Sequence, residues 1–237
     1  MEEPRAHIEL PEPPGRMRQL PRDARGYVYP WFVDTLPSTG QLDHRTMNRG
    51  KLVQAIERGL CWVCGGPMGT RRRTFLIGPM CLVNRVTAEP GCHYECAEYS
   101  ARYCPFLSRP KQKRRQFRDE ELGGLEKSSA GMPICRNPGV ALLYSTLDWH
   151  PERIRADRSR GIGSGILFRL GDPERLNAFA EGRPATVEEL NASIESGLPI
   201  LMEAARADGP SAVLELHAAK RLADQAISTR MMAEVSP

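Results

Sequence analysis

The sequence predicts an α+β fold, and three features of its pattern support this class. Two short runs rich in β-forming residues, at 139–147 and 165–170, favour strands. Apolar residues spaced as on one face of a helix occur before these runs, at 43–60, and after them, at 186–231. A compact cysteine-rich region at 61–107 lies between the first helical segment and the first strand.

The N-terminal part of the chain is expected to begin with an arm and to continue into the folded body. Residues 1–25 contain five prolines and few large apolar groups, which predicts an extended or disordered arm. Aromatic residues first gather at 26–33, so the folded body is expected to begin there. A helix follows within 43–60, where Gly59 would weaken the last turn.

The cysteine-rich region contains two further predicted elements. Residues 75–86 are rich in β-formers but are interrupted by Gly78 and Pro79, which predicts two short strands or an irregular hairpin. Residues 93–104 contain neither glycine nor proline and are followed by Pro105, which predicts a three-turn helix. We place a module boundary near residue 110.

The second half of the chain is predicted to be a basic, flexible connector at 111–138 and an α+β part at 139–237 with two or three strands. The Arg-rich segment 151–160 separates the two predicted strands. Whether this C-terminal part is an independent domain is left open by the sequence.

Three helices are predicted near the C-terminus. Thr186 and Glu189 have the spacing of a capping box, in which the two side chains satisfy amides of the first turn. This helix is expected to end at Gly197, and Pro199 suits the first turn of a second helix. A third helix is predicted from residue 211 to about 231.

Length and composition exclude several classes of protein. The chain has 237 residues, of which 41% are hydrophobic and 26% charged, so wholesale disorder is excluded. It contains no apolar run of the roughly 18–20 residues that cross a bilayer. The acidic, proline-rich start differs from a secretory signal, so a cytoplasmic location is expected. The seven cysteines should then be reduced, serving metal ligation or packing rather than disulfides.

The spacing of four residues predicts a zinc site. Cys61 and Cys64 are two residues apart and are followed by two glycines, a pattern typical of a zinc knuckle. After a 28-residue insert at 65–92, His93 and Cys96 have a second short spacing that suits the first turn of a helix. With four protein ligands the Zn²⁺ would be structural, and a knuckle, a hairpin and a ligand-bearing helix follow the plan of a treble clef.

Two alternatives to this assignment are kept. Cys92 competes with His93 for the metal, because it lies four residues before Cys96 and could share its helix face. An HNH-like treble-clef nuclease would need a general-base histidine on the hairpin, and 74–90 contains none. The remaining cysteines are expected to be buried as small hydrophobic residues; they are Cys81, Cys104 and Cys135.

Several motifs resemble those of uncharacterised bacterial and phage-associated zinc-finger-like proteins. They are Cys-Trp-Val-Cys-Gly at 61–65, Gly-Pro-Met-Cys-Leu-Val-Asn-Arg at 78–85, His-Tyr-Glu-Cys-Ala at 93–97 and Cys-Pro-Phe-Leu at 104–107. The resemblance covers about residues 26–200 and implies an intact finger, but it brings no activity. Such proteins often carry a proline where this chain has Gly91-Cys92, which leaves a ligand role for Cys92 open.

Charge is distributed unevenly along the chain. The formal net charge is only +4, but residues 102–118 contain seven basic and no acidic side chains, whereas 172–203 is acid-rich. Such segregation favours a polyanionic partner for the basic part. The candidate nucleic-acid-binding residues are Arg71, Arg72, Arg73, Lys111, Lys113, Arg114, Arg115 and Arg118.

The sequence therefore predicts a non-enzymatic, zinc-stabilised protein that binds nucleic acid. The alternative is a protein-interaction adaptor or inhibitor that acts on a host protein complex through its acidic C-terminal helices. An enzyme would need polar groups that converge in one cleft, and no spacing in the sequence requires this. The partner and the oligomeric state are left open.

Overall fold

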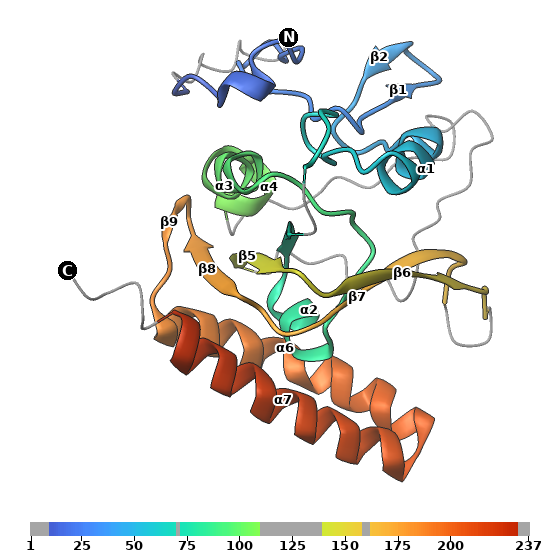
Figure 1. Cartoon of the computed structure of the whole chain (residues 1–237), viewed down its shortest axis with the longest axis vertical. Helices are drawn as coiled ribbons and strands as arrows, with labels where there is room; N and C mark the ends of the chain where they lie inside the picture. The colour runs from blue at the N-terminus through green and yellow to red at the C-terminus, as the bar shows by residue number, and fades with distance from the viewer. Residues whose placement is uncertain (1–9, 70–71, 110–138, 158–161, 232–237) are drawn as a thin grey trace, which may run out of the picture.

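The computed structural model describes residues 10–69, 72–109, 139–157 and 162–231, and these residues form an α+β protein (Figure 1). The helices are η1 (Gly15–Met17), α1 (Arg49–Glu57), α2 (Pro79–Asn84), α3 (Tyr94–Tyr103), α4 (Pro105–Ser108), α6 (Val187–Asp208) and α7 (Pro210–Arg230). The strands are β1 (Thr35–Leu36), β2 (Gln41–Leu42), β3 (Arg73–Ile77), β4 (Val86–Thr87), β5 (Val140–Thr146), β6 (Trp149–Ile154), β7 (Gly165–Leu170), β8 (Arg175–Ala180) and β9 (Arg183–Pro184).

An antiparallel sheet in the order β3-β5-β8-β9 forms the centre of the molecule. A second antiparallel sheet has the order β4-β7-β6, and β1 and β2 form a small separate pair. Both larger sheets combine strands that precede residue 110 with strands that follow residue 139. The two segments separated in the sequence analysis thus share their sheets in the structure.

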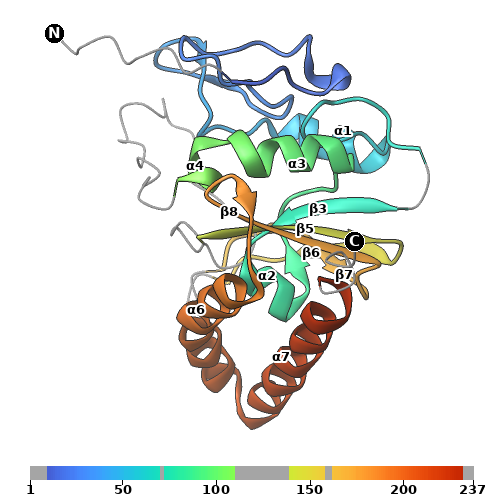
Figure 2. The same ribbon diagram turned by 90° about the vertical axis from the view of Figure 1, so that its left-hand side faces the viewer.

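The central sheet is covered on both faces, which explains why every residue of β5 is buried. On one face, Leu142 and Tyr144 join a core with α2, α6 and α7. On the other face, Ala141 and Leu143 join a core with α3 and the segment around Cys61. Figure 2 shows α3 on one side of the strands and α6 and α7 on the opposite side.

The predicted strand at 139–147, the strand at 165–170 and the helix at 93–104 are confirmed as β5, β7 and α3. Of the two alternatives for 75–86, the irregular hairpin is wrong, and the two short strands are present only at the two ends of the segment, as β3 and β4. Between β3 and β4 the chain enters α2, because Pro79 occupies the first turn of this helix, where a missing N–H costs little. Arg85 ends α2 in a left-handed conformation, and β4 pairs with β7 rather than with β3.

The C-terminal part contains more strands and fewer helices than expected. The first residues of the Arg-rich segment 151–160, which was predicted to separate two strands, belong to strand β6. The strand β8 was not predicted individually. The capping box of Thr186 and Glu189 is confirmed, with hydrogen bonds in both directions. The prediction that the first of the three C-terminal helices ends at Gly197 is wrong, because α6 continues through Pro199 to Asp208. The described part of this region therefore contains two long helices, α6 and α7, instead of three.

Part of the predicted N-terminal arm is folded. Residues 1–9 lie outside the described residues, but Met17 in η1 is only 2% exposed and packs in the same core as α3. The Tyr99 hydroxyl also donates a hydrogen bond to the Pro11 carbonyl at 3.2 Å, which fixes this segment against α3. None of the helices in the described part of the chain has the length and hydropathy needed to span a membrane.

Candidate metal centre

The turn that follows Cys61 places two sulfur atoms on the same side of the backbone. The Gly65 amide donates to the Cys61 carbonyl at 2.8 Å, and the Cys61 amide donates to the Gly66 carbonyl at 2.8 Å, so the turn is closed from both ends. Gly65 has φ = +72°, a conformation that glycine adopts without steric cost. A Cβ at this position would lie 2.6 Å from the Trp31 ring, so glycine is required for space as well.

Backbone amides around the turn point at the sulfur atoms. The Cys64 amide lies 3.5 Å from Cys61 Sγ, and the Gly66 amide lies 3.4 Å from Cys64 Sγ. The His93 amide, from the start of α3, lies 3.3 Å from Cys61 Sγ. These donors favour the thiolate form, which is the form that binds metal ions.

The start of α3 supplies the other two candidate ligands. His93 is the N-cap residue of this helix, and Cys96 lies in its first turn with no exposed surface. His93 Nδ1 lies 3.4 Å from Cys64 Sγ and 4.0 Å from Cys96 Sγ. A helix N-terminus also favours a negative charge, which suits the Cys96 thiolate.

The orientation of the His93 ring is set by a contact outside the cluster. Its Nε2 lies 3.2 Å from the Pro67 carbonyl, which can only accept a hydrogen bond. A neutral ring would therefore keep its proton on Nε2, which leaves Nδ1, the nitrogen that faces the sulfur atoms, as the ligand atom. Such carbonyl contacts commonly orient histidine ligands in metal sites.

These four side chains are close enough to hold one metal ion. Their ligand atoms all lie within 4.8 Å of one another, and three of the residues are buried, with His93 half-buried. In a tetrahedral site with metal–sulfur bonds of about 2.3 Å, neighbouring sulfur atoms are separated by about 3.8 Å. The cluster thus needs little movement to close around an ion.

The four groups strongly perturb one another's protonation. Hydrogen bonds from Cys64 and then Cys96 lower the pKa of the Cys61 thiol far below its ordinary value. The pKa of Cys96 is correspondingly raised, chiefly by its hydrogen bonds with Cys61 and Cys64. The hydrogen bond with Cys61 also raises the pKa of His93 to about 10. A metal ion would displace these shared protons, so metal binding must weaken in acid.

Cys92 lies beside the cluster but does not belong to it. Its Sγ donates a hydrogen bond to the Thr74 carbonyl at 3.1 Å, and its backbone forms a bridge with Thr74 on β3. Burial raises its pKa well above the ordinary value, which disfavours a thiolate. His93, not Cys92, is therefore the residue that the structure brings together with Cys61, Cys64 and Cys96.

The other cysteines have different surroundings. Cys81 lies on α2 against the core, and burial raises the pKa of its thiol to about 11, as expected for an inert packed cysteine. Cys104 is the N-cap residue of α4 and is half-buried. Cys135 lies outside the described residues.

Only two of the candidate nucleic-acid-binding residues lie in the described part of the chain. Arg72 is exposed and pairs with Glu174, with Nε 2.7 Å from the carboxylate. Arg73 is only 8% exposed, and its guanidinium lies 5.5 Å from the centre of the Trp149 ring. Arg73 is thus part of the packing. The expectation that it is available at the surface to bind nucleic acid is wrong. The others lie outside the described residues; they are Arg71, Lys111, Lys113, Arg114, Arg115 and Arg118.

The sequence analysis did not assign the residues that support the cluster. Trp31 closes over the turn, and Trp62, between the two cysteines, stacks on Phe32 with ring centres 4.6 Å apart. Lys51 on α1 donates to the Trp31 and Val33 carbonyls at 2.6 and 3.0 Å. The aromatic concentration at 26–33 was the signal in the sequence, but it did not show that these rings contact the knuckle.

In the ranges that the structure describes, no second group of three or more Cys, His, Asp or Glu side chains is placed to hold a metal ion. Comparisons with protein-family models, with curated proteins and with solved structures found no match.

Proposed function

We propose that the Cys61, Cys64, His93 and Cys96 cluster binds Zn²⁺ and that the ion has a structural role in a non-enzymatic binding protein. Three thiolates and one imidazole form a ligand set that suits zinc better than the hard cations, which prefer oxygen. Four protein ligands fill a tetrahedral shell, so no position is left for a catalytic water. The proximity of these four side chains is the observation that carries the proposal.

The ion would hold together two segments that lie far apart in the sequence. One pair of ligands lies between α1 and β3, and the other lies at the start of α3, which packs against β3 and β5. Metal binding would therefore anchor α3 to the central sheet and to the aromatic residues around Trp62. The knuckle and the ligand-bearing helix are two parts of a treble-clef arrangement, although β3 and β4 do not form its hairpin.

The metal proposal can be tested with two cysteine variants. Purified wild-type protein should contain one equivalent of zinc by emission spectroscopy, and Cys96→Ala should lose most of it. Cys92→Ala is the matched control, because it removes an equally buried thiol beside the cluster. Equal zinc contents in the wild type and Cys96→Ala, or loss of zinc in Cys92→Ala alone, would refute the ligand assignment.

For the partner, we propose nucleic acid, bound through the basic sequence that follows α4. This sequence contains Lys111, Lys113, Arg114, Arg115 and Arg118 and no acidic residue before Asp119. Its start is held by the folded body, because Arg109 Nη2 donates a hydrogen bond to the Tyr27 hydroxyl at 3.1 Å. α3 leads directly into α4, so the described residues that precede the basic run in the sequence belong to the folded body.

The nucleic-acid proposal predicts salt-dependent binding that charge reversal abolishes. Binding of fluorescent single- and double-stranded DNA and RNA should weaken with about one power of salt concentration per phosphate neutralised. The Lys113→Glu, Arg114→Glu, Arg115→Glu triple variant should lose this binding. A control triple variant reverses exposed arginines elsewhere, at Arg18, Arg58 and Arg221. An unchanged affinity in the first variant, or an equal loss in both, would exclude the basic run as the binding surface.

One observation favours the adaptor as a second candidate function. Leu214 and Leu222 on α7 are 71% and 48% exposed, so this helix, which packs against the core, also presents two large apolar side chains to solvent. A protein partner bound there should survive nuclease treatment and high salt. Leu214→Glu should abolish such an interaction without affecting binding to nucleic acid.

A further inference from the structure

The turn that bears the first two cysteines of the cluster is held from outside by residues 31–33, which we call the strap. The Trp31 amide donates a hydrogen bond to the Val63 carbonyl at 2.7 Å. The Phe32 ring stacks on the Trp62 ring with their centres 4.6 Å apart. Both residues that lie between the two cysteines in the sequence therefore contact the strap.

The start of α1 binds the strap through all three of its carbonyl groups. Lys51 Nζ donates to the Trp31 and Val33 carbonyls at 2.6 and 3.0 Å. The carbonyl between them, on Phe32, accepts a hydrogen bond from the Asn48 amide at 2.9 Å. Asn48 is also the N-cap residue of α1, and its side chain accepts from the Lys51 amide. The strap thus links the start of α1 to the turn that bears the cysteines.

The polar contacts of the Lys51 ammonium group are made with the strap. This side chain is half-buried, and no carboxylate pairs with it in the ranges that the structure describes. Its Nζ lies 5.7 Å from the centre of the Trp31 ring, a position in which the ring attracts a cation. Removing a charge from water is costly unless other groups replace the lost hydration. Here the two carbonyls and the ring do so, and all three belong to the strap.

We propose that Lys51 is a positioning residue of the metal centre, which holds the strap against the turn and thereby keeps Cys61 and Cys64 in place. This inference rests on the proposed role of the cluster in binding Zn²⁺. Residues that orient metal ligands without binding the metal typically cost about 10–100-fold in metal affinity when they are mutated. Because Lys51 acts through the strap, we expect an effect at the lower end of this range.

Two rates, measured on the full-length protein as purified, test the proposal. One is the rate at which excess chelator removes zinc, and the other is the rate at which an aromatic disulfide labels each cysteine, followed by mass spectrometry. Lys51→Met keeps an apolar stem but removes the donor, so zinc loss and labelling of Cys61 and Cys64 should become about tenfold faster. Labelling of Cys81 should not change, because it packs in the core on the other face of the central sheet. Lys51→Arg keeps a charged donor and should restore most of the wild-type protection.

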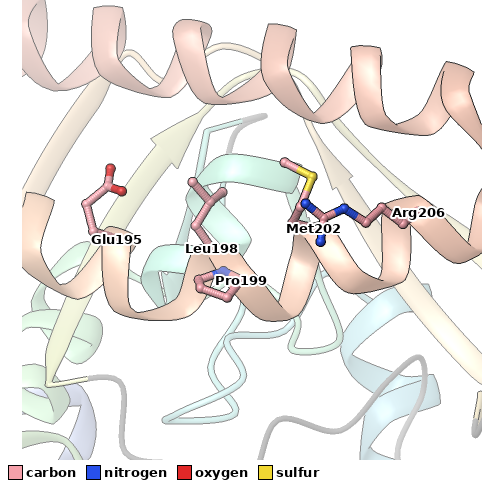
Figure 3. A pocket seen from close by; sticks show the side chains of 5 residues that line it. All are labelled: Glu195, Leu198, Pro199, Met202 and Arg206. Carbon is pink, nitrogen blue, oxygen red and sulfur yellow. The ribbon is translucent and has the colours of Figure 1, made fainter.

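Two control variants separate positioning from a general loss of charge or stability. Arg58→Met removes an exposed cation at the end of α1 and should leave both rates unchanged. Leu198→Ala on α6 (Figure 3) shortens a side chain that packs against the opposite core. It should lower the stability of the protein without speeding labelling of Cys61 and Cys64 more than that of Cys81. If Lys51→Met does not fold, Lys51→Gln, which keeps a neutral donor, provides the same comparison with a smaller expected rise.

Three results would overturn the proposal: rates in the Lys51 variants that match the wild type, an equal rise in Arg58→Met, or labelling of Cys81 that rises as much as that of Cys61 and Cys64. Failure of the zinc proposal would give a different result. A wild type that contains no zinc, but whose Cys61 and Cys64 lose protection in Lys51→Met, would refute the metal and retain the role of Lys51 in placing the two thiols. A zinc-containing wild type whose rates do not depend on Lys51 would refute this inference alone.

Discussion

Replacing Gly65 with alanine tests whether the turn after Cys64 sets the geometry of the metal site. The residue has φ = +72°, where a side chain costs about 1–2 kcal/mol. The new Cβ would also lie 2.6 Å from two atoms of the Trp31 ring, which must move, and such overpacking typically costs about 1–3 kcal/mol. Together these effects should lower the free energy of unfolding of the zinc-loaded protein by about 2–5 kcal/mol.

The assay is urea unfolding in the presence of excess zinc, followed by tryptophan fluorescence, because Trp31 and Trp62 lie beside the site. Competition with a chromogenic chelator then measures zinc affinity, which should also fall in Gly65→Ala. Gly69→Ala is the control, since a Cβ at that position meets nothing within 4 Å. If Gly65→Ala loses no more stability than Gly69→Ala, the turn does not constrain the site and the reasoning fails.

Three further changes probe other parts of the fold. Thr186→Ala removes half of the capping box of α6 and should cost about 1 kcal/mol in thermal or urea unfolding; a change near zero would mean that the cap is unimportant. Leu142→Ala leaves a cavity in a fully buried strand and should cost about 2–5 kcal/mol by the same measurement, whereas a loss below that of the Thr186 variant would contradict the two-sided core. The hydrogen bond from the Arg45 side chain lowers the pKa of Asp43 below its value in the unfolded chain. The ionised Asp43 carboxylate therefore stabilises the fold at pH values above the unfolded pKa, and this contribution is lost as the pH falls through the folded pKa. Asp43→Asn should therefore be less stable than the wild type at neutral pH, with the difference vanishing in acid; a constant difference at all pH values would exclude this linkage.

The Cys/His cluster was predictable because its four residues form two local pairs. Each pair is set by a short spacing on a turn or on the first turn of a helix, and such spacings need no knowledge of the fold. The choice between Cys92 and His93 did need the fold, because pairing of the Cys92 backbone with Thr74 turns its thiol toward β3. The contact of Pro67 with the imidazole ring was equally invisible in the sequence.

The errors in the fold share a physical cause, which is that proline has more than one role. Pro79 was interpreted as a strand breaker but begins α2, and Pro151 was interpreted as part of a separator but lies within β6. Pro199 was expected to begin a helix but lies inside α6. β6 tolerates its proline as an edge strand of its sheet. In α6, packing of buried residues on both sides of Pro199, including Ile194 and Ala205, outweighs the lost hydrogen bond.

The position of β5 between β3 and β8 has a consequence for how the protein folds during its synthesis. All four residues of the Cys/His cluster lie before residue 97, so they are synthesised before any of β5. At that stage α3 could contact a bound ion but not β5, the strand against which it packs in the folded protein. The pairings of β5 with β3 and β8 join distant residues, so the central sheet is expected to form slowly. If the cluster binds Zn²⁺ as proposed, zinc that is present early would keep the first half of the protein organised during this interval. A shortage of zinc during translation should then reduce the yield of native protein more than chelation after folding.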